Sequence, residues 1–247
     1  MGKHFKVKKK KRILLNLLTI IFLLGIIIST SYIIKWYKEN RKNKDLENKL
    51  ADIAVVDENK EGGYNINFKE LKNINNEVIG WLKVNGTNIE YVVVKATNNS
   101  YYLDHNFEKK SNSAGWIFAD YKNKFDGTDK NIIIYGHNRK DNSMFGSLKN
   151  ILTEEWYTNE DNLTIDFITE SKHHRYQVFS VYKIENEDYY IDTEFGNKEF
   201  DSFVNTLKKR SIKDFNVDIS SEDSILTLST CANNNKYRVV LHAVRIK

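Results

Sequence analysis

The stretch SILTLSTCANNNKYRVVLHAVR, residues 224–245, holds two apolar runs separated by residues 232–237, three of which are asparagines. Apolar and β-branched runs on either side of such a segment predict a strand, a turn and a second strand. Asparagine tolerates positive φ and hydrogen-bonds its own backbone in turns. In a symmetric hairpin, Cys231 and Arg238 would face each other, with their Cβ atoms roughly 4.5–5.5 Å apart.

Cys231 is the only cysteine of the chain, so no disulfide can form within it. A neighbouring cation such as Arg238 favours the thiolate, which is the nucleophilic form of cysteine. The alternative is that Cys231 is a small buried hydrophobe, which a lone cysteine at the end of an apolar strand most often is. An arginine beside a purely structural cysteine would need another explanation, and the pattern therefore favours a reactive thiol.

Basic residues are concentrated at the N-terminus. Seven of the first 12 residues are Lys or Arg and none is acidic, while the other 31 basic residues face all 33 acidic residues of the chain. The net charge of +5 therefore comes from the tail. A nucleic-acid-binding domain needs a basic patch on its folded part, and the composition offers none, so no nucleic-acid partner is expected.

Residues 13–34, ILLNLLTIIFLLGIIISTSYII, contain no charged side chain. At about 1.5 Å per residue, a helix of this length spans roughly 33 Å and crosses a hydrocarbon core of about 30 Å. By the positive-inside rule, the basic tail (residues 1–12) is expected in the cytoplasm and the rest of the chain outside the cell. The alternative, a cleaved signal peptide, has a shorter apolar run and a small-residue cleavage site. A single-pass anchor that contacts membrane lipid is therefore favoured.

Beyond the span, the chain is expected to form a helical stalk over residues 35–65 and a folded extracellular domain over residues 66–247. The dipeptide Asn85–Gly86, between two apolar runs, is a strong hairpin signal. The expected strands are 78–84, 88–96, 116–119, 131–135, 163–168, 176–184 and the pair within 224–245; the expected helices are 144–152 and 198–210. So many strands with so few helices predict a mainly β protein, a barrel or a sandwich with helical insertions.

A cysteine nucleophile near neutral pH needs a base, usually histidine. His137 follows the continuous apolar run 131–135 and a glycine, and functional side chains are commonly presented where a rigid strand gives way to a loop. Gly136 is expected to permit a sharp turn at this point. A purely structural histidine is the alternative. The other five histidines are interpreted as solvated, as surface loop residues or as out of reach of the thiol: His4, His105, His173, His174 and His242.

The charge state of a Cys231–His137 pair has two possible descriptions. At their ordinary pKa values, a cysteine and a histidine are both mostly uncharged at pH 7. The pair would work either as a mutually stabilised ion pair, with Arg238 assisting, or through a minority form, and the sequence leaves both open. A zinc site is not indicated, since the chain has no Cys-x-x-Cys and no histidine pair at helical spacing.

Two motifs connect these residues to a known family. TLSTC ends at Cys231 and is followed within ten residues by Arg238, and YGHN contains His137. In this order the motifs resemble those of the sortases, the cysteine transpeptidases of Gram-positive cell surfaces, and class B members most closely. The similarity extends through NEVIGWLKVNGTNIEYVVV, NNSYYLDHNFEKKSNSAGWIFAD and IIIYGHNRKDNSMFGSLKN, and covers the chain from about residue 67 to its C-terminus.

The resemblance implies an eight-stranded sortase-type β-barrel with N-terminal helices and a helical insertion before the penultimate strand. It implies that Cys231 is the nucleophile, that His137 is the general acid and base, and that Arg238 lies near the developing oxyanion. The substrate-binding positions that it implies are Asn99, Leu103, Tyr190, Ile191 and Ser229.

The implied activity is cleavage of an NPxT-like sorting signal in surface proteins through a thioacyl-enzyme, followed by transfer to an amine of peptidoglycan or lipid II. No cofactor is implied, and no acidic cluster suggests the calcium site of another sortase class, so a metal-independent enzyme is expected. Two alternatives stay open. A hydrolytic cysteine peptidase would use the same residues with water as the acceptor, and a surface-tethered binding module would not need the three side chains to converge.

Overall fold

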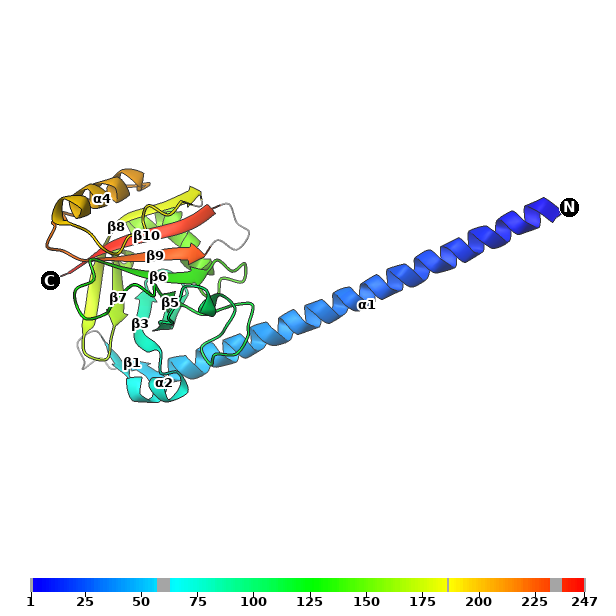
Figure 1. The fold of residues 1–247 in the computed structure, drawn as a ribbon, viewed down its shortest axis with the longest axis horizontal. Helices are drawn as coiled ribbons and strands as arrows, with labels where there is room; N and C mark the ends of the chain where they lie inside the picture. The colour runs from blue at the N-terminus through cyan, green and yellow to red at the C-terminus, as the bar shows by residue number, and fades with distance from the viewer. Residues whose placement is uncertain (1, 57–62, 186, 232–236, 247) are drawn as a thin grey trace. The chain divides into compact units, whose positions relative to one another are not determined.

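A computed structural model describes residues 2–56, 63–185, 187–231 and 237–246 (Figure 1). The polypeptide divides into two compact units, Met1–Leu46 and Glu47–Lys247. The first unit lies within helix α1 (Gly2–Ile53), and its large apolar side chains between residues 13 and 34 are exposed. Among the residues that the structure describes, α1 is the one helix long and apolar enough to cross a membrane.

The segment expected to be a helical stalk has a different structure after its first half. Helix α1 ends at Ile53, and β1 (Ala54–Val56) follows and pairs antiparallel with β2 (Tyr64–Ile66). Two of the three residues of β1 are valines, whose β-branched side chains favour a strand over a helix. Residues 57–62, also within the expected stalk, lie outside the described residues.

Eight strands form a closed barrel in the order β10-β8-β7-β3-β4-β5-β6-β9. Within the barrel, the β4–β5 and β6–β9 pairs are parallel, and the other strand pairs are antiparallel. The predicted eight-stranded barrel is thereby confirmed. Its strands are β3 (Val78–Val84), β4 (Ile89–Val94), β5 (Phe118–Ala119), β6 (Asn131–His137), β7 (Thr164–Ile168), β8 (His173–Glu185), β9 (Ile225–Cys231) and β10 (Tyr237–Arg245).

Helices occupy the connections between strands. Helix α4 (Asn197–Arg210) lies between β8 and β9, which confirms the expected insertion before the penultimate strand. The helix expected at 144–152 is present as the 3₁₀ helix η2 (Gly146–Leu152). The remaining short helices are α2 (Phe68–Ile74), η1 (Tyr101–Leu103), α3 (Glu154–Thr158) and η3 (Glu160–Leu163).

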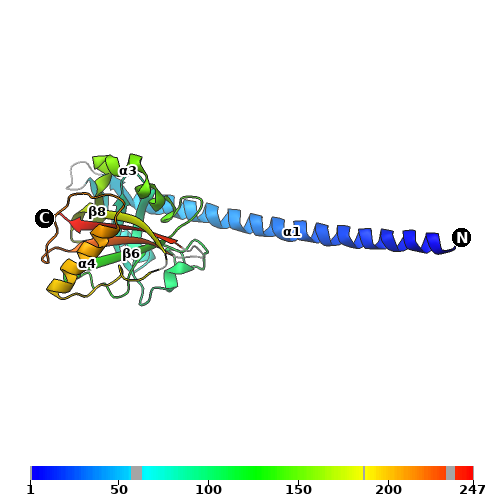
Figure 2. The same cartoon turned by 90° about the horizontal axis from the view of Figure 1, so that it is seen from above.

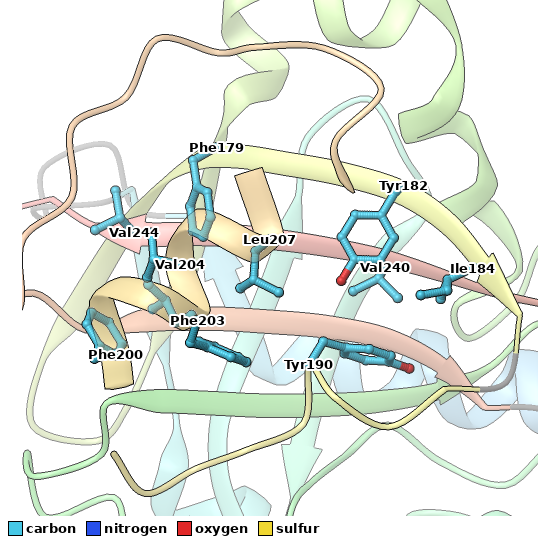
Figure 3. Close-up of a cluster of buried hydrophobic side chains, with 11 residues drawn as sticks. Phe179, Tyr182, Ile184, Tyr190, Phe200, Phe203, Val204, Leu207, Val240 and Val244 are labelled. Carbon is cyan, nitrogen blue, oxygen red and sulfur yellow. The ribbon is translucent and has the colours of Figure 1, made fainter. Parts of the chain in front are cut away.

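The strands β6, β9 and β10 present two different faces, because successive side chains of a strand point to opposite sides. The inner face is apolar and buried, with Ile134, Leu226, Leu228, Leu241 and Ala243. On the outer face, helix α4 packs over β8 and β10 (Figures 1 and 2). Its side chains Phe200, Val204 and Leu207 share one buried cluster with Val240 and Val244 of β10 (Figure 3). Helix α4 therefore covers one end of this outer face.

Candidate active site

The central strand β9 carries Cys231 at its end and has a partner on each side. On one side, β6 runs parallel to it, and the Cα atoms of His137 and Cys231 are partners in the ladder. On the other side, β10 runs antiparallel with Val240 opposite Ser229. The same register carried two residues further places Arg238 opposite Cys231, as the hairpin pattern predicts. Of the turn predicted at residues 232–237, Tyr237 belongs to β10, and residues 232–236 lie outside the described residues.

This register brings the sulfur, the imidazole and the guanidinium onto one face at one end of the barrel. Hydrogen-bonded strands lie about 4.8 Å apart, so Cys231 has His137 and Arg238 as its immediate cross-strand neighbours. His137 lies 94 positions before Cys231 in the sequence, and Arg238 lies seven positions after it. A parallel β6–β9 pair and an antiparallel β9–β10 pair are together sufficient to make them meet.

His137 is the last residue of β6 and is 4% exposed. Its Nε2 donates a hydrogen bond to the carbonyl oxygen of Leu103 at 2.6 Å, so the neutral ring takes up a further proton on Nδ1. Burial lowers the pKa of His137 below its ordinary value, and the nearby Arg139 lowers it further against the opposing effect of the Leu103 carbonyl. The imidazole is therefore neutral at pH 7.

Gly136 has a different role from the one expected. The strand continues through it to His137, and its φ is not in the positive range, so no sharp turn occurs there. A Cβ at this position would lie 2.5 Å from Cδ1 of Ile117 and 2.6 Å from Cγ of Phe145. Close packing against these two side chains, and not a turn, excludes a larger residue.

Cys231 is the last residue of β9 and is partly buried. Burial raises the pKa of the Cys231 thiol to about 12, although the positive charge of Arg238 acts in the opposite direction. The thiol is therefore protonated at pH 7, next to a neutral imidazole. Of the two descriptions that the sequence leaves open, the structure favours a neutral resting pair over a preformed ion pair.

Arg238 is held by the segment that follows β8. Its Nη1 donates to the hydroxyl of Tyr190 at 3.3 Å, and its Nη2 lies 3.8 Å from Oδ1 of Asp188. Burial lowers the pKa of Arg238, but Tyr190 and Asp188 outweigh it, and the net pKa is raised, so the guanidinium stays charged. Its buried Nε has no hydrogen-bond partner within the described part of the chain. One donor of the guanidinium is thus unsatisfied beside Cys231.

The five expected substrate-binding residues fall into two groups. Asn99, Leu103 and Ile191 are partly exposed. Tyr190 and Ser229 are completely buried, and the Tyr190 hydroxyl lies 2.9 Å from Oγ of Ser229. These two residues therefore support the site from beneath and do not line its surface in this structure. The sequence pattern did not indicate this, since it contains no information on what covers the outer face of β9.

Two residues that the sequence reasoning missed also belong to this region. The buried carboxylate of Asp120 accepts hydrogen bonds from Nδ2 of Asn99 at 2.8 Å and from the hydroxyl of Tyr135 at 2.9 Å. Gly115 has φ of +61°, and a Cβ there would lie 2.5 Å from the carbonyl oxygen of Tyr102 and 2.8 Å from Cδ2 of His137. Gly115 thus leaves the space that the imidazole occupies. Its position after a run of small residues is the only sequence signal for this.

The other described histidines have different surroundings from His137. His105 is part-buried and stacks on Tyr101. His173 and His174 belong to β8 and not to a polar turn, because β8 begins earlier than expected and pairs with β7 at these residues. His242 is fully buried in the middle of β10, about four residues along the strand from Arg238, which confirms that it is out of reach.

A comparison with known proteins connects this arrangement to a family. The profile of the sortase domain matches residues 82–246, which include the strands β4 to β10. Sortase B of Listeria monocytogenes is 33% identical over 81% of this chain and 82% of its own length. The chain belongs to the sortase family.

Solved structures place this sortase more narrowly. Sortase B from Bacillus anthracis, in complex with AAEK1, superimposes with a TM-score of 0.75 at 33% identity, over 85% of this chain and 99% of that chain. The Staphylococcus aureus sortase B–substrate complex gives a TM-score of 0.68 at 34% identity, over 73% of this chain and 84% of that chain. The resemblance to class B is thereby confirmed, and the protein is a cell-surface sortase and a cysteine transpeptidase.

Proposed function

We propose that this sortase forms a thioacyl-enzyme on Cys231, with His137 as the general acid and base and Arg238 as the oxyanion-stabilising group. The observation that carries the proposal is the ladder register, in which Cys231 has His137 on one side and the position of Arg238 on the other. Cys231 is the only cysteine of the sequence, and it has a histidine and an arginine as its neighbours on the two flanking strands.

The steps follow from the protonation states. The neutral imidazole of His137 takes the thiol proton as the sulfur attacks the scissile carbonyl carbon, and the carbonyl oxygen becomes an oxyanion. The guanidinium of Arg238, with its unpartnered Nε, stabilises this charge. When the intermediate collapses, the C–N bond breaks and the imidazolium gives its proton to the leaving amine. The acyl group then remains on sulfur.

Release of the acyl group requires a second nucleophile. A transpeptidase uses an amine, here an amine of peptidoglycan or lipid II, whose proton His137 takes as the C–S bond breaks. The substrate would be a surface protein with an NPxT-like C-terminal sorting signal. The S. aureus relative was solved as a substrate complex, which supports a peptide substrate here, bound at Asn99, Leu103 and Ile191. Tyr190 and Ser229 would form the floor beneath it.

The N-terminal helix fits the role of a membrane anchor. Its apolar side chains at residues 13–34 are exposed, and apolar surface of this extent is stable in a lipid core but not in water. In this proposal residues 1–12 are cytoplasmic, residues 13–34 cross the membrane once, and the barrel lies outside. A signal sequence satisfies the same length and composition, and the N-terminal sequence of the protein from membranes distinguishes the two.

The test of the reaction uses the full chain in detergent with a quenched fluorescent peptide of the NPxT type. We expect cleavage that is lost in Cys231→Ala and, when an amine acceptor is added, a product joined to that amine by mass spectrometry. Product that contains only a free carboxylate, at every amine concentration, would favour a hydrolytic peptidase. Cleavage that survives in Cys231→Ala would refute the mechanism, and a binding module would bind the peptide without cleaving it.

A further inference from the structure

A group of buried polar side chains lies on the outer face of the barrel, between Cys231 and helix α4. Asn131 of β6, Thr227 of β9 and His242 of β10 are each 0% exposed. The proposed reaction uses none of them. Buried polar groups are unfavourable unless they are hydrogen-bonded, and apolar side chains would serve a purely structural contact equally well. The hydrogen-bond partners of these three side chains therefore indicate their role.

The orientation of the Asn131 side chain follows from its neighbours. Its Nδ2 lies 2.9 Å from the carbonyl oxygen of Asp192 and 3.4 Å from that of Tyr190. Only the amino group can donate to carbonyl oxygens, so these contacts fix the amide. Oδ1 then faces Oγ1 of Thr227 at 2.7 Å and must accept from it.

The direction of the remaining bonds follows in turn. A threonine hydroxyl has one proton, and that of Thr227 is given to Asn131. Nδ1 of His242, 2.9 Å from Oγ1 of Thr227, must therefore donate. Burial lowers the pKa of His242, so the ring is uncharged. It is then the neutral Nδ1–H tautomer, and its Nε2 accepts from the hydroxyl of Tyr182 at 2.8 Å. Four strands thus contribute to one directed chain of donors, from Tyr182 to the carbonyls of Tyr190 and Asp192.

The chain ends on the segment that holds Arg238. Tyr190, whose backbone carbonyl is near Asn131, has its hydroxyl 3.3 Å from Nη1 of Arg238 and 2.9 Å from Oγ of Ser229. Asp188 of the same segment lies 3.8 Å from Nη2 of Arg238. Figure 3 shows Tyr182 and Tyr190 on this side of the strands, at the end of the cluster away from Phe200. The segment is therefore fixed by Asn131 at its backbone and contacts the guanidinium through its side chains.

We propose that Tyr182, His242, Thr227 and Asn131 form a positioning chain that holds residues 188–192 in place and thereby orients Arg238 for the reaction. The effect on turnover rests on the proposed function, whereas the effect on the segment does not. None of the four residues touches the substrate in this scheme. They act through Tyr190 and Asp188, as positioning residues.

The experiment compares three variants of the full chain in detergent. Thr227→Val has nearly the same shape but lacks the hydroxyl, Thr227→Ser restores it, and Ser180→Ala is the matched control. Ser180 is equally buried on β8 and donates to the carbonyl oxygen of Leu207 in α4 at 2.7 Å, outside the chain. The measurements are peptide-cleavage kinetics and amide hydrogen exchange of residues 187–192.

We expect Thr227→Val to lower kcat/KM about tenfold, mostly in kcat, because the oxyanion that Arg238 meets exists only after attack. Thr227→Ser and Ser180→Ala should stay within about twofold of the wild type. Hydrogen exchange in residues 187–192 should be faster in Thr227→Val and unchanged in Ser180→Ala. If Thr227→Val does not fold, Tyr182→Phe takes its place. We then expect a lower kcat/KM and faster exchange in residues 187–192 for Tyr182→Phe than for Ser180→Ala.

Two results would overturn the proposal. One is unchanged exchange in residues 187–192 after the hydroxyl is lost. The other is an equal loss of kcat/KM in Ser180→Ala, which would mean that general destabilisation is the cause. If the wild type shows no turnover that depends on Cys231, the proposed function fails, and the exchange rates still decide whether the chain holds the segment.

Discussion

His137 and His242 lie on the two strands that flank β9, on the same outer face, and both are buried. His242 has a partner on each ring nitrogen, Thr227 and Tyr182. His137 donates from Nε2 to the carbonyl of Leu103, and the side chain of Cys231 is its neighbour in the ladder. In the proposed mechanism His137 is the catalytic histidine, so burial and residue type alone do not distinguish it from His242, whereas its place beside Cys231 at the end of β6 does.

The largest effect should come from replacing each histidine by glutamine, which keeps a donor but cannot take up a proton at neutral pH. His137→Gln should lower kcat/KM by about 10²–10⁴-fold, the range of general acid–base catalysis, with little change in unfolding. His242→Gln should lower kcat/KM only about tenfold, through the positioning chain, and should lower the free energy of unfolding by about 1–3 kcal/mol, since it disturbs buried hydrogen bonds. Peptide-cleavage kinetics and urea unfolding measure the two quantities. Equal losses of activity in both variants would remove the distinction between the two sites.

Arg238 provides the second test, because its charge and its hydrogen bonds can be separated. Arg238→Ala should lower kcat by about 10²–10³-fold, as loss of an oxyanion donor does. It should also slow alkylation of Cys231 by iodoacetamide, because the positive charge lowers the pKa of the thiol and its removal raises that pKa further.

Arg238→Lys is the control for the charge. A lysine keeps the cation but has no planar fork of donors, so alkylation should return toward the wild-type rate while turnover stays low. Full recovery of turnover by lysine would mean that Arg238 contributes charge alone. In the wild type, alkylation should be slow at pH 7 and rise continuously to pH 10, because the thiol is protonated at neutral pH.

Local patterns in the sequence predicted a mainly β protein, a barrel or a sandwich, and the family resemblance implied the eight-stranded barrel that the structure has. The β9–β10 register follows from a hairpin pattern around Cys231 and Arg238, and His137 was a candidate base both from its place after an apolar run and from the motif resemblance. Two local predictions were wrong. The helix expected to continue to residue 65 ends at Ile53, and the chain does not turn at Gly136. Both depend on contacts from elsewhere in the chain, namely the pairing of β1 with β2 and the packing of Gly136 against Phe145.

Burial was the second kind of information missing from the sequence. Tyr190 and Ser229 were expected in the groove, yet both are completely covered. The segment after β8 and helix α4 provide that cover, and the alternation within β9 does not reveal it. For the same reason, the partners of His242 on two other strands could not be predicted.

A smaller effect is expected from Gly115→Ala, which changes the surroundings of His137 and leaves the imidazole in place. The new Cβ would lie 2.8 Å from Cδ2 of His137 at a residue with φ of +61°. We expect kcat/KM to fall about tenfold and stability to fall by about 1–2 kcal/mol, from strain and crowding together. Gly127→Ala is the control, since its φ is +92° and a Cβ there has no atom within 4 Å. If both variants lose activity equally, backbone strain and not contact with the ring is responsible.

The most direct measure of how the two histidines differ is the pH dependence of stability. Burial lowers the pKa of His242 to about 3, whereas a histidine in an unfolded chain has a pKa of about 6.5. Between these values the unfolded chain binds a proton that the folded chain excludes. Stability contributed by the neutral ring is therefore present above about pH 6.5 and is lost as the pH falls, at up to about 1.4 kcal/mol per pH unit.

His242→Gln should remove this slope, so the wild-type and variant curves of unfolding free energy should converge as the pH falls from 6.5 to 4.5 and run parallel above pH 7.5. His137→Gln should change the slope in the same direction but less, because the Leu103 carbonyl opposes the lowering of the His137 pKa by burial. Parallel curves for His242→Gln over the whole range would mean that the ring titrates in the folded protein as it does in the unfolded chain. The hydroxyl of Tyr182 would then be able to accept from Nε2, and the direction of the buried chain would not be fixed.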